Sequence, residues 1–220
     1  MSAINPAPGI PGLIESPEEA EYELRAAEGS VWTGTRLAIG IVAFAFAGLA
    51  FAYFYLRSAN NDQSWRPHGV TAPTDIGTSI VALTIAAGAL ALLGNVRLRR
   101  GLRADWQVAG WTVVATGLLV VALQIWELTR LRFFPGSSGY ASCFIGWAAM
   151  NIALVLGATY WIETLLARGL RLRRALVEEG ATPAALSAER LFRANAEGCT
   201  LFWGFTAAVA AFFWLLFYIF

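Results

Sequence analysis

The sequence predicts an all-α integral membrane protein with five transmembrane helices. Hydrophobic residues make up 57% of its 220 residues and charged residues only 14%, whereas a soluble domain carries about 25% charged residues. The apolar residues gather in five segments of about 20 residues, the length that crosses about 30 Å of hydrocarbon as an α-helix. These segments are 37–56, 76–96, 106–126, 143–166 and 199–220.

Residues 1–30 differ in composition from the five-helix membrane domain expected over residues 31–220. Prolines near the start predict an extended tail. Ser16 then has the pattern of an N-cap, with Pro17 in the first turn and Glu19 completing a capping box. We expect a short acidic helix that ends near Glu28 and lies on the membrane surface or against a partner. Because this segment is acidic and a secretory signal begins with basic residues, no cleaved signal peptide is expected.

The arginines predict the orientation. All sixteen basic residues are Arg, and five spans place the N-terminal segment on the same side as the loops after the second and fourth spans. Twelve arginines lie on that side, and the other side holds only four, Arg57, Arg66, Arg130 and Arg132. By the positive-inside rule we expect the N-terminus in the cytoplasm and the C-terminus outside.

The loop between the last two spans is long and basic. Thr182 and Pro183 have the pattern of a helix N-cap and first turn, so a helical hairpin is expected there. Arg171, Arg173 and Arg174 are candidate contacts for anionic lipid headgroups. Charge that only sets the topology is the alternative explanation for these arginines.

Residues that bind metals are scarce in the sequence. His68 is the single histidine and falls in a loop, so we expect it to be an ordinary loop residue. Cys143 opens the fourth span and Cys199 the fifth, at opposite membrane faces about 30 Å apart. Since a disulfide needs Cα atoms within about 7 Å, both should be free thiols. The net charge of +1 lacks the basic excess of a nucleic-acid-binding protein.

Two glutamates lie near the ends of spans. Glu127 is at the outer end of the third span and Glu163 near the inner end of the fourth. An acid within a membrane span is a functional hypothesis by default. The alternative is an ion pair at the interface, with Arg130 for Glu127 and Arg168 for Glu163.

A small polar cluster is predicted at the turn between the third and fourth spans. Gln124 lies one helical turn from Glu127 on the same face. Ser138 and Ser142 lie in the turn that follows, so we expect the four side chains to associate and to fix this turn. Asn151, near the centre of the fourth span, is expected to tie helices together.

Glycines predict where helices approach one another closely. Gly40 and Gly48 lie in the first span, and Gly110 and Gly117 in the third. Small residues allow the backbones of membrane helices to come close together. Together with Ala43 and Ala47 in the first span and Ala115 in the third, these glycines permit a close approach of helix backbones.

Several segments follow the order and spacing of a known family. They are Phe46-Ala47-Gly48-Leu49 leading into Tyr53-Phe54-Tyr55-Leu56-Arg57, Trp65-Arg66-Pro67, Gln124-Ile125-Trp126-Glu127, Ser137-Ser138-Gly139-Tyr140-Ala141-Ser142, and Trp203-x-Phe205 with Tyr218. Together they resemble subunit III of haem-copper (cytochrome c) oxidases in its short five-helix bacterial form.

The chain also departs from that pattern. Val42 stands where the family has a glutamate in this helix, and Asn151 and Leu154 stand where it has a His-x-x-His pair. Gly204 and Ala207 replace the polar residues of its Trp-His-Phe-x-Asp motif. The resemblance is therefore to a divergent member, and the related accessory protein of nitric oxide reductases is the alternative.

The resemblance implies an accessory, non-redox subunit of a terminal oxidase in the bacterial cytoplasmic membrane. Such a subunit packs beside the haem- and copper-bearing subunits I and II during aerobic respiratory electron transport, stabilises the catalytic subunit and binds phospholipid. It has no cofactor or catalytic centre of its own. An assembly or scaffold protein of the respiratory chain is a second class. A small-molecule transporter is a third, but Asn151 is the one polar residue that the sequence places near mid-membrane.

Overall fold

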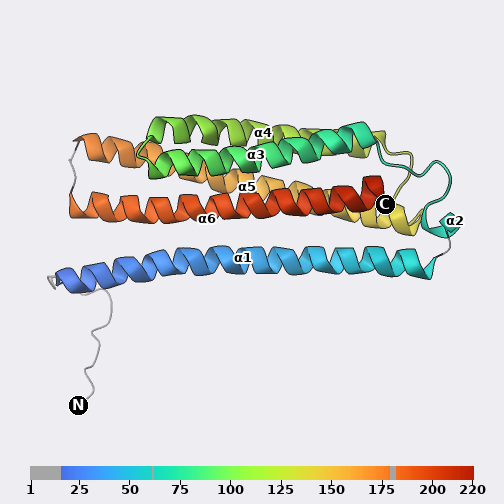
Figure 1. Cartoon of the computed structure of the whole chain (residues 1–220), viewed down its shortest axis with the longest axis horizontal. Helices are drawn as coiled ribbons and strands as arrows, with labels where there is room; N and C mark the ends of the chain where they lie inside the picture. The colour runs from blue at the N-terminus through green and yellow to red at the C-terminus, as the bar shows by residue number, and fades with distance from the viewer. Residues whose placement is uncertain (1–15, 61, 179–181) are drawn as a thin grey trace, which may run out of the picture.

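The computed structural model describes residues 16–60, 62–178 and 182–220. Its elements are α1 (Pro17–Ala59), α2 (Asp62–Trp65), α3 (Thr74–Arg99), α4 (Arg103–Arg130), α5 (Gly139–Glu178), α6 (Pro183–Trp214) and a π-helical turn, η1 (Leu215–Ile219) (Figure 1). Each of the first four predicted spans falls within one long helix, and the fifth runs through α6 and η1 and ends at Phe220, one residue past η1. Five helices are long and apolar enough to cross a membrane. Over the described residues, the prediction of an all-helical chain with five helices of membrane-spanning length is therefore confirmed.

Four of the long helices form a bundle, and the fifth lies beside it. Helices α3, α4, α5 and α6 form a ring in which each helix packs against the next, and α6 packs against α3 to close the ring. Helix α1 contacts α5 and α6 and runs along the outer side of α6 (Figure 1). The bundle core holds large aromatic side chains that are almost fully buried, among them Trp147, Trp203, Phe144, Phe213 and Phe217.

The start of α1 differs from the expectation of a separate acidic helix. Ser16 forms the predicted capping box, since its hydroxyl accepts from the Glu19 N–H at 3.2 Å and the Glu19 carboxylate accepts from the Ser16 N–H at 2.9 Å. The helix does not end near Glu28 but continues to Ala59, over 43 residues. No proline interrupts residues 18–66, so the backbone ladder has no reason to break where the composition changes. The tail predicted for residues 1–12 lies outside the described residues.

Helix α1 is much longer than the membrane is thick. At about 1.5 Å per residue its length is about 65 Å, roughly twice the hydrocarbon thickness. Helices α5 and α6 also extend past their predicted spans, and the Thr182 hydroxyl caps α6 by accepting from the Ala185 N–H at 3.3 Å. Three helical extensions therefore lie at the same end of the molecule.

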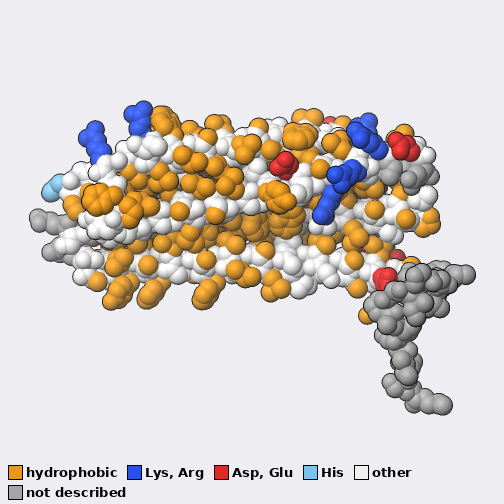
Figure 2. All heavy atoms as spheres, turned by 180° about the vertical axis from the view of Figure 1, so that it is seen from behind, with side chains coloured by type: hydrophobic (Ala, Val, Ile, Leu, Met, Phe, Trp, Pro, Cys, Tyr) orange, Lys and Arg blue, Asp and Glu red, His pale blue; other side chains and the backbone are white. Residues whose placement is uncertain are grey.

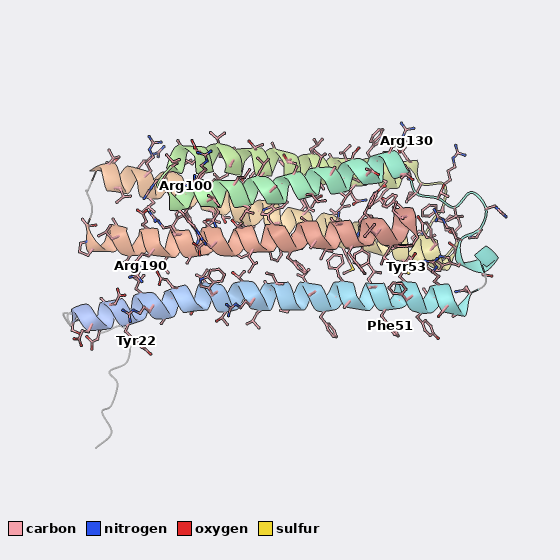
Figure 3. The ribbon with its side chains drawn as sticks, in the orientation of Figure 1. Tyr22, Phe51, Tyr53, Arg100, Arg130 and Arg190 are labelled. Atoms are coloured by element: carbon pink, nitrogen blue, oxygen red, sulfur yellow. The ribbon has the colours of Figure 1, made fainter. Side chains whose placement is uncertain are left out.

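Charged side chains separate from apolar ones along the helices. Figure 2 shows a broad apolar surface, with arginine side chains gathered toward the two ends. Figure 3 shows Arg100 and Arg190 at the end where α1 and α6 begin and Arg130 at the opposite end. This is the pattern of a protein whose middle faces hydrocarbon and whose ends face water.

Candidate functional site

Glu127 is fully buried near the C-terminal end of α4. Its Oε2 accepts a hydrogen bond from Gln124 Nε2 at 2.5 Å, and its Oε1 accepts one from the Tyr218 hydroxyl at 2.5 Å. Both carboxyl oxygens therefore have a donor, which a buried carboxyl group requires. The predicted association of Gln124 with Glu127 is present, and Tyr218 is a further partner that no local sequence pattern indicates.

The hydrogen bonds continue into α5. Asn151 Nδ2 donates to Gln124 Oε1 at 2.9 Å, and both side chains are fully buried. The expectation that Asn151 ties helices together is confirmed, because this bond joins α5 to α4. The chain Asn151, Gln124, Glu127 and Tyr218, which we call the carboxyl network, links three elements through uncharged donors.

Gly77 on α3 leaves the space that the Tyr218 ring occupies in the network. A Cβ atom on Gly77 would lie 2.2 Å from both Cε1 and Cζ of Tyr218, far closer than atoms can approach. The next residue of α3, Thr78, is hydrogen-bonded to α6, since Trp214 Nε1 donates to Thr78 Oγ1 at 3.2 Å. Helix α3 therefore leaves room for the Tyr218 ring at Gly77 and is also joined to α6 by a hydrogen bond.

Two further tyrosines hold the π-helical turn that carries Tyr218. The Tyr53 hydroxyl donates to the Leu216 carbonyl at 2.7 Å, and the Tyr140 hydroxyl donates to the Phe217 carbonyl at 2.9 Å. Figure 3 shows Tyr53 reaching from α1 toward the end of α6. Carbonyls at a helix end or in a π-helical turn lose regular i+4 partners, and these hydroxyls replace them. Tyrosines from α1, α5 and η1 thus converge at one end of the bundle.

Ser138 and Ser142 form a separate group in the α4–α5 turn. Ser138 Oγ caps α5 by accepting from the Ala141 N–H at 3.1 Å. Ser142 Oγ donates to the Ser138 carbonyl at 3.0 Å and accepts from the Gly136 N–H at 3.0 Å. The two serines do fix the turn, but through its backbone. Within the described residues, no hydrogen bond joins them to Glu127.

The other candidate residues lie outside the carboxyl network. The Arg130 guanidinium lies over the Trp126 ring, 5.2 Å from its centroid, while Glu127 faces the interior. The alternative interpretation, an ion pair between Glu127 and Arg130, is therefore wrong. Glu163 is exposed on α5, and His68 is exposed in the loop before α3. The candidate lipid contacts on the α5 extension are also exposed: Arg171, Arg173 and Arg174. Cys143 and Cys199 are buried free thiols, as predicted.

The arrangement is suited to positioning helices. The Glu127 carboxyl group accepts from an amide on its own helix α4 and from a phenol on η1, so these hydrogen bonds restrict both elements. In a low-dielectric interior such a network is costly to break. Comparison with known proteins adds no assignment, since no family model and no curated protein match the chain.

Proposed function

We propose that this chain is the accessory, non-redox subunit III of a haem-copper terminal oxidase in the bacterial cytoplasmic membrane. It would lie beside subunits I and II, which hold haem and copper. It would support the catalytic subunit by packing against it and bind phospholipid, while the whole complex oxidises cytochrome c or quinol with oxygen. Its N-terminus would lie in the cytoplasm.

The observation that carries the proposal is the convergence of the segments on which the resemblance rests. Tyr53 from the first segment contacts Trp65 from the second, with ring centroids 5.0 Å apart. Trp65 contacts Tyr140 from the serine-rich segment, with centroids 6.1 Å apart. Tyr218 from the last segment bonds Glu127 from the Gln-x-Trp-Glu segment. Segments up to 165 residues apart in the sequence thus build one cluster, which membrane composition alone does not require.

The outer face of α1 supports an accessory role. Phe44, Phe51, Phe54 and Tyr55 are all more than half exposed, and Figure 3 shows Phe51 pointing away from the bundle. Helix α1 therefore uses one face to contact α5 and α6 and leaves an aromatic face outward. Such a surface suits lipid or a larger membrane partner.

The test is purification of the tagged chain in mild detergent. We expect haem- and copper-bearing subunits to co-purify in equal amount. Gentle removal of the chain should leave haem absorbance and copper content unchanged but shorten the period over which oxygen consumption continues, because loss of a packing partner loosens the exposed helices.

Other outcomes distinguish the alternatives. Loss of a haem band on removal would mean that the chain supports the cofactor site directly, and would contradict the accessory role. Nitric oxide reductase subunits in the purified material would favour the related accessory protein. Absence of the chain from the mature enzyme would favour an assembly factor.

A further inference from the structure

An apolar groove lies between α5 and α6, next to the ends of their predicted spans. Leu165, Arg168 and Leu172 line it from α5, and Leu191, Phe192 and Asn195 from α6, with a volume of about 260 Å³. Arg168 lies two residues past the end of the predicted fourth span at residue 166. The groove therefore lies close to where hydrocarbon gives way to lipid headgroups.

Several acidic side chains around this end are engaged by arginines other than Arg168. Arg103 and Arg193 both bind Glu189, which is next to the groove on α6. Arg190 binds Glu21 and Glu28 of α1, and Arg99 binds Glu197. Within the described residues, Arg168 and Arg171 form no ion pair. The positive charge of α5 near the groove is thus left without a carboxylate partner.

A second hollow on α5 is less suited to an anion. It is formed by one helix and contains Arg173 and Arg174 together with Val177 and Glu178. The Glu178 carboxylate opposes an anionic ligand there, whereas no acid lines the groove at Arg168. The charge therefore favours the groove over the hollow.

We propose that the groove between α5 and α6 binds one anionic phospholipid of the surrounding bilayer. The Arg168 guanidinium contacts the phosphate, since a guanidinium matches phosphate oxygens with two parallel donors. The half-buried side chains of Leu172 and Leu191 contact the apolar part of the lipid and are thereby shielded further from water. This site does not depend on the identity of the partner complex.

The test measures lipid binding to the full chain after delipidation. Dioleoylphosphatidylglycerol and dioleoylphosphatidylcholine are added separately in detergent, and bound lipid is counted by native mass spectrometry. We expect phosphatidylglycerol to bind more tightly. Arg168→Gln should weaken the binding of phosphatidylglycerol about fivefold, the effect of one arginine at an anionic surface, and weaken the binding of phosphatidylcholine less, because its choline cation offsets the phosphate charge.

Arg132→Gln is the matched control, because Arg132 is also exposed but lies at the opposite end of the bundle. It should change neither affinity. Equal binding of the two lipids by the unaltered chain would overturn the proposal, as would an equal loss in Arg168→Gln and Arg132→Gln. A loss confined to Arg173→Gln would move the site to the second hollow and would also overturn it. None of these outcomes bears on co-purification with an oxidase.

Discussion

Tyr218 and Glu127 show how a single residue depends on a distant one. Their hydrogen bond spans 91 positions of the sequence, and the bond survives because α3 offers a glycine where the Tyr218 ring lies. Glu127 is wholly buried, so each of its oxygens needs a donor. Gln124 supplies one donor from the preceding turn of the same helix, and only the fold supplies the other.

We predict that Gly77→Ala destabilises the bundle by displacing Tyr218 from Glu127. The loss of a buried hydrogen bond to a carboxyl group should lower the free energy of unfolding by about 1–3 kcal/mol. Thermal unfolding in detergent, followed by tryptophan fluorescence, measures the change. Gly157→Ala is the control, because nothing lies within 4 Å of a Cβ built on Gly157.

A double-mutant cycle isolates the cause. In a Tyr218→Ala background the clash is absent, so Gly77→Ala should cost much less than in the unaltered chain. Equal costs in both backgrounds would show that the effect comes from α3 itself and not from the carboxyl network.

Helix α1 is fastened to the bundle at points spread along its length. At its start, Arg190 of α6 binds Glu21 at 3.0 Å and Glu28 at 2.9 Å, and Figure 3 shows Arg190 between the two helices. Further along, Thr35 is buried against Gly198, where a Cβ atom would lie 2.5 Å from Thr35 Oγ1. At the far end, the Tyr53 hydroxyl binds the Leu216 carbonyl. The first contact is ionic and exposed, and the other two are buried.

We predict that Arg190→Ala loosens the first part of α1 alone. Hydrogen–deuterium exchange of backbone amides in residues 17–36 should become faster, while exchange in α4 stays the same. High salt should have the same effect on the unaltered chain, because exposed ion pairs are screened.

Arg193→Ala provides the matched control for this element. Arg193 binds Glu189 within α6, so its loss should leave exchange in α1 unchanged. Unchanged exchange in residues 17–36 of Arg190→Ala would show that the ion pairs to Glu21 and Glu28 do not hold the two helices together.

The arginines of the whole molecule are concentrated toward one end. The twelve arginines predicted for one side all lie in the half of the molecule where α1 and α6 begin, and the other four lie at the opposite end with His68. Charged loops are retained in the cytoplasm during insertion when they are rich in arginine. The grouping of the arginines in the structure therefore also predicts how the protein is oriented in the membrane.

We predict that the arginine-rich end faces the cytoplasm. Cys143 and Cys199 are buried, so a variant lacking both can carry one new cysteine at an exposed position. A membrane-impermeant maleimide added to intact cells should label His68→Cys and leave Arg100→Cys unlabelled until the cells are opened. Labelling of Arg100→Cys in intact cells would reverse the orientation.

Some features of this protein follow from the sequence by itself. The five spans follow because a helix needs an apolar run of about 20 residues to cross hydrocarbon, and such a run is local. The caps at Ser16 and Thr182 follow because a capping side chain bonds a backbone N–H only three residues away. The free thiols follow because the spans alone place Cys143 and Cys199 at opposite ends.

Other features were decided by tertiary structure, because they depend on which helix faces meet. Gly110 and Gly117 do face Leu166 and Thr159, but Gly40 and Gly48 face outward, with nothing within 4 Å of a Cβ. Composition marked a boundary near residue 30, yet α1 continues, since a helix ends where its backbone ladder is interrupted and not where its polarity changes. The partner of Glu127 was likewise set by packing: only the packing of α6 against α3 and α5 brings the Tyr218 hydroxyl to a carboxyl group far away in the sequence.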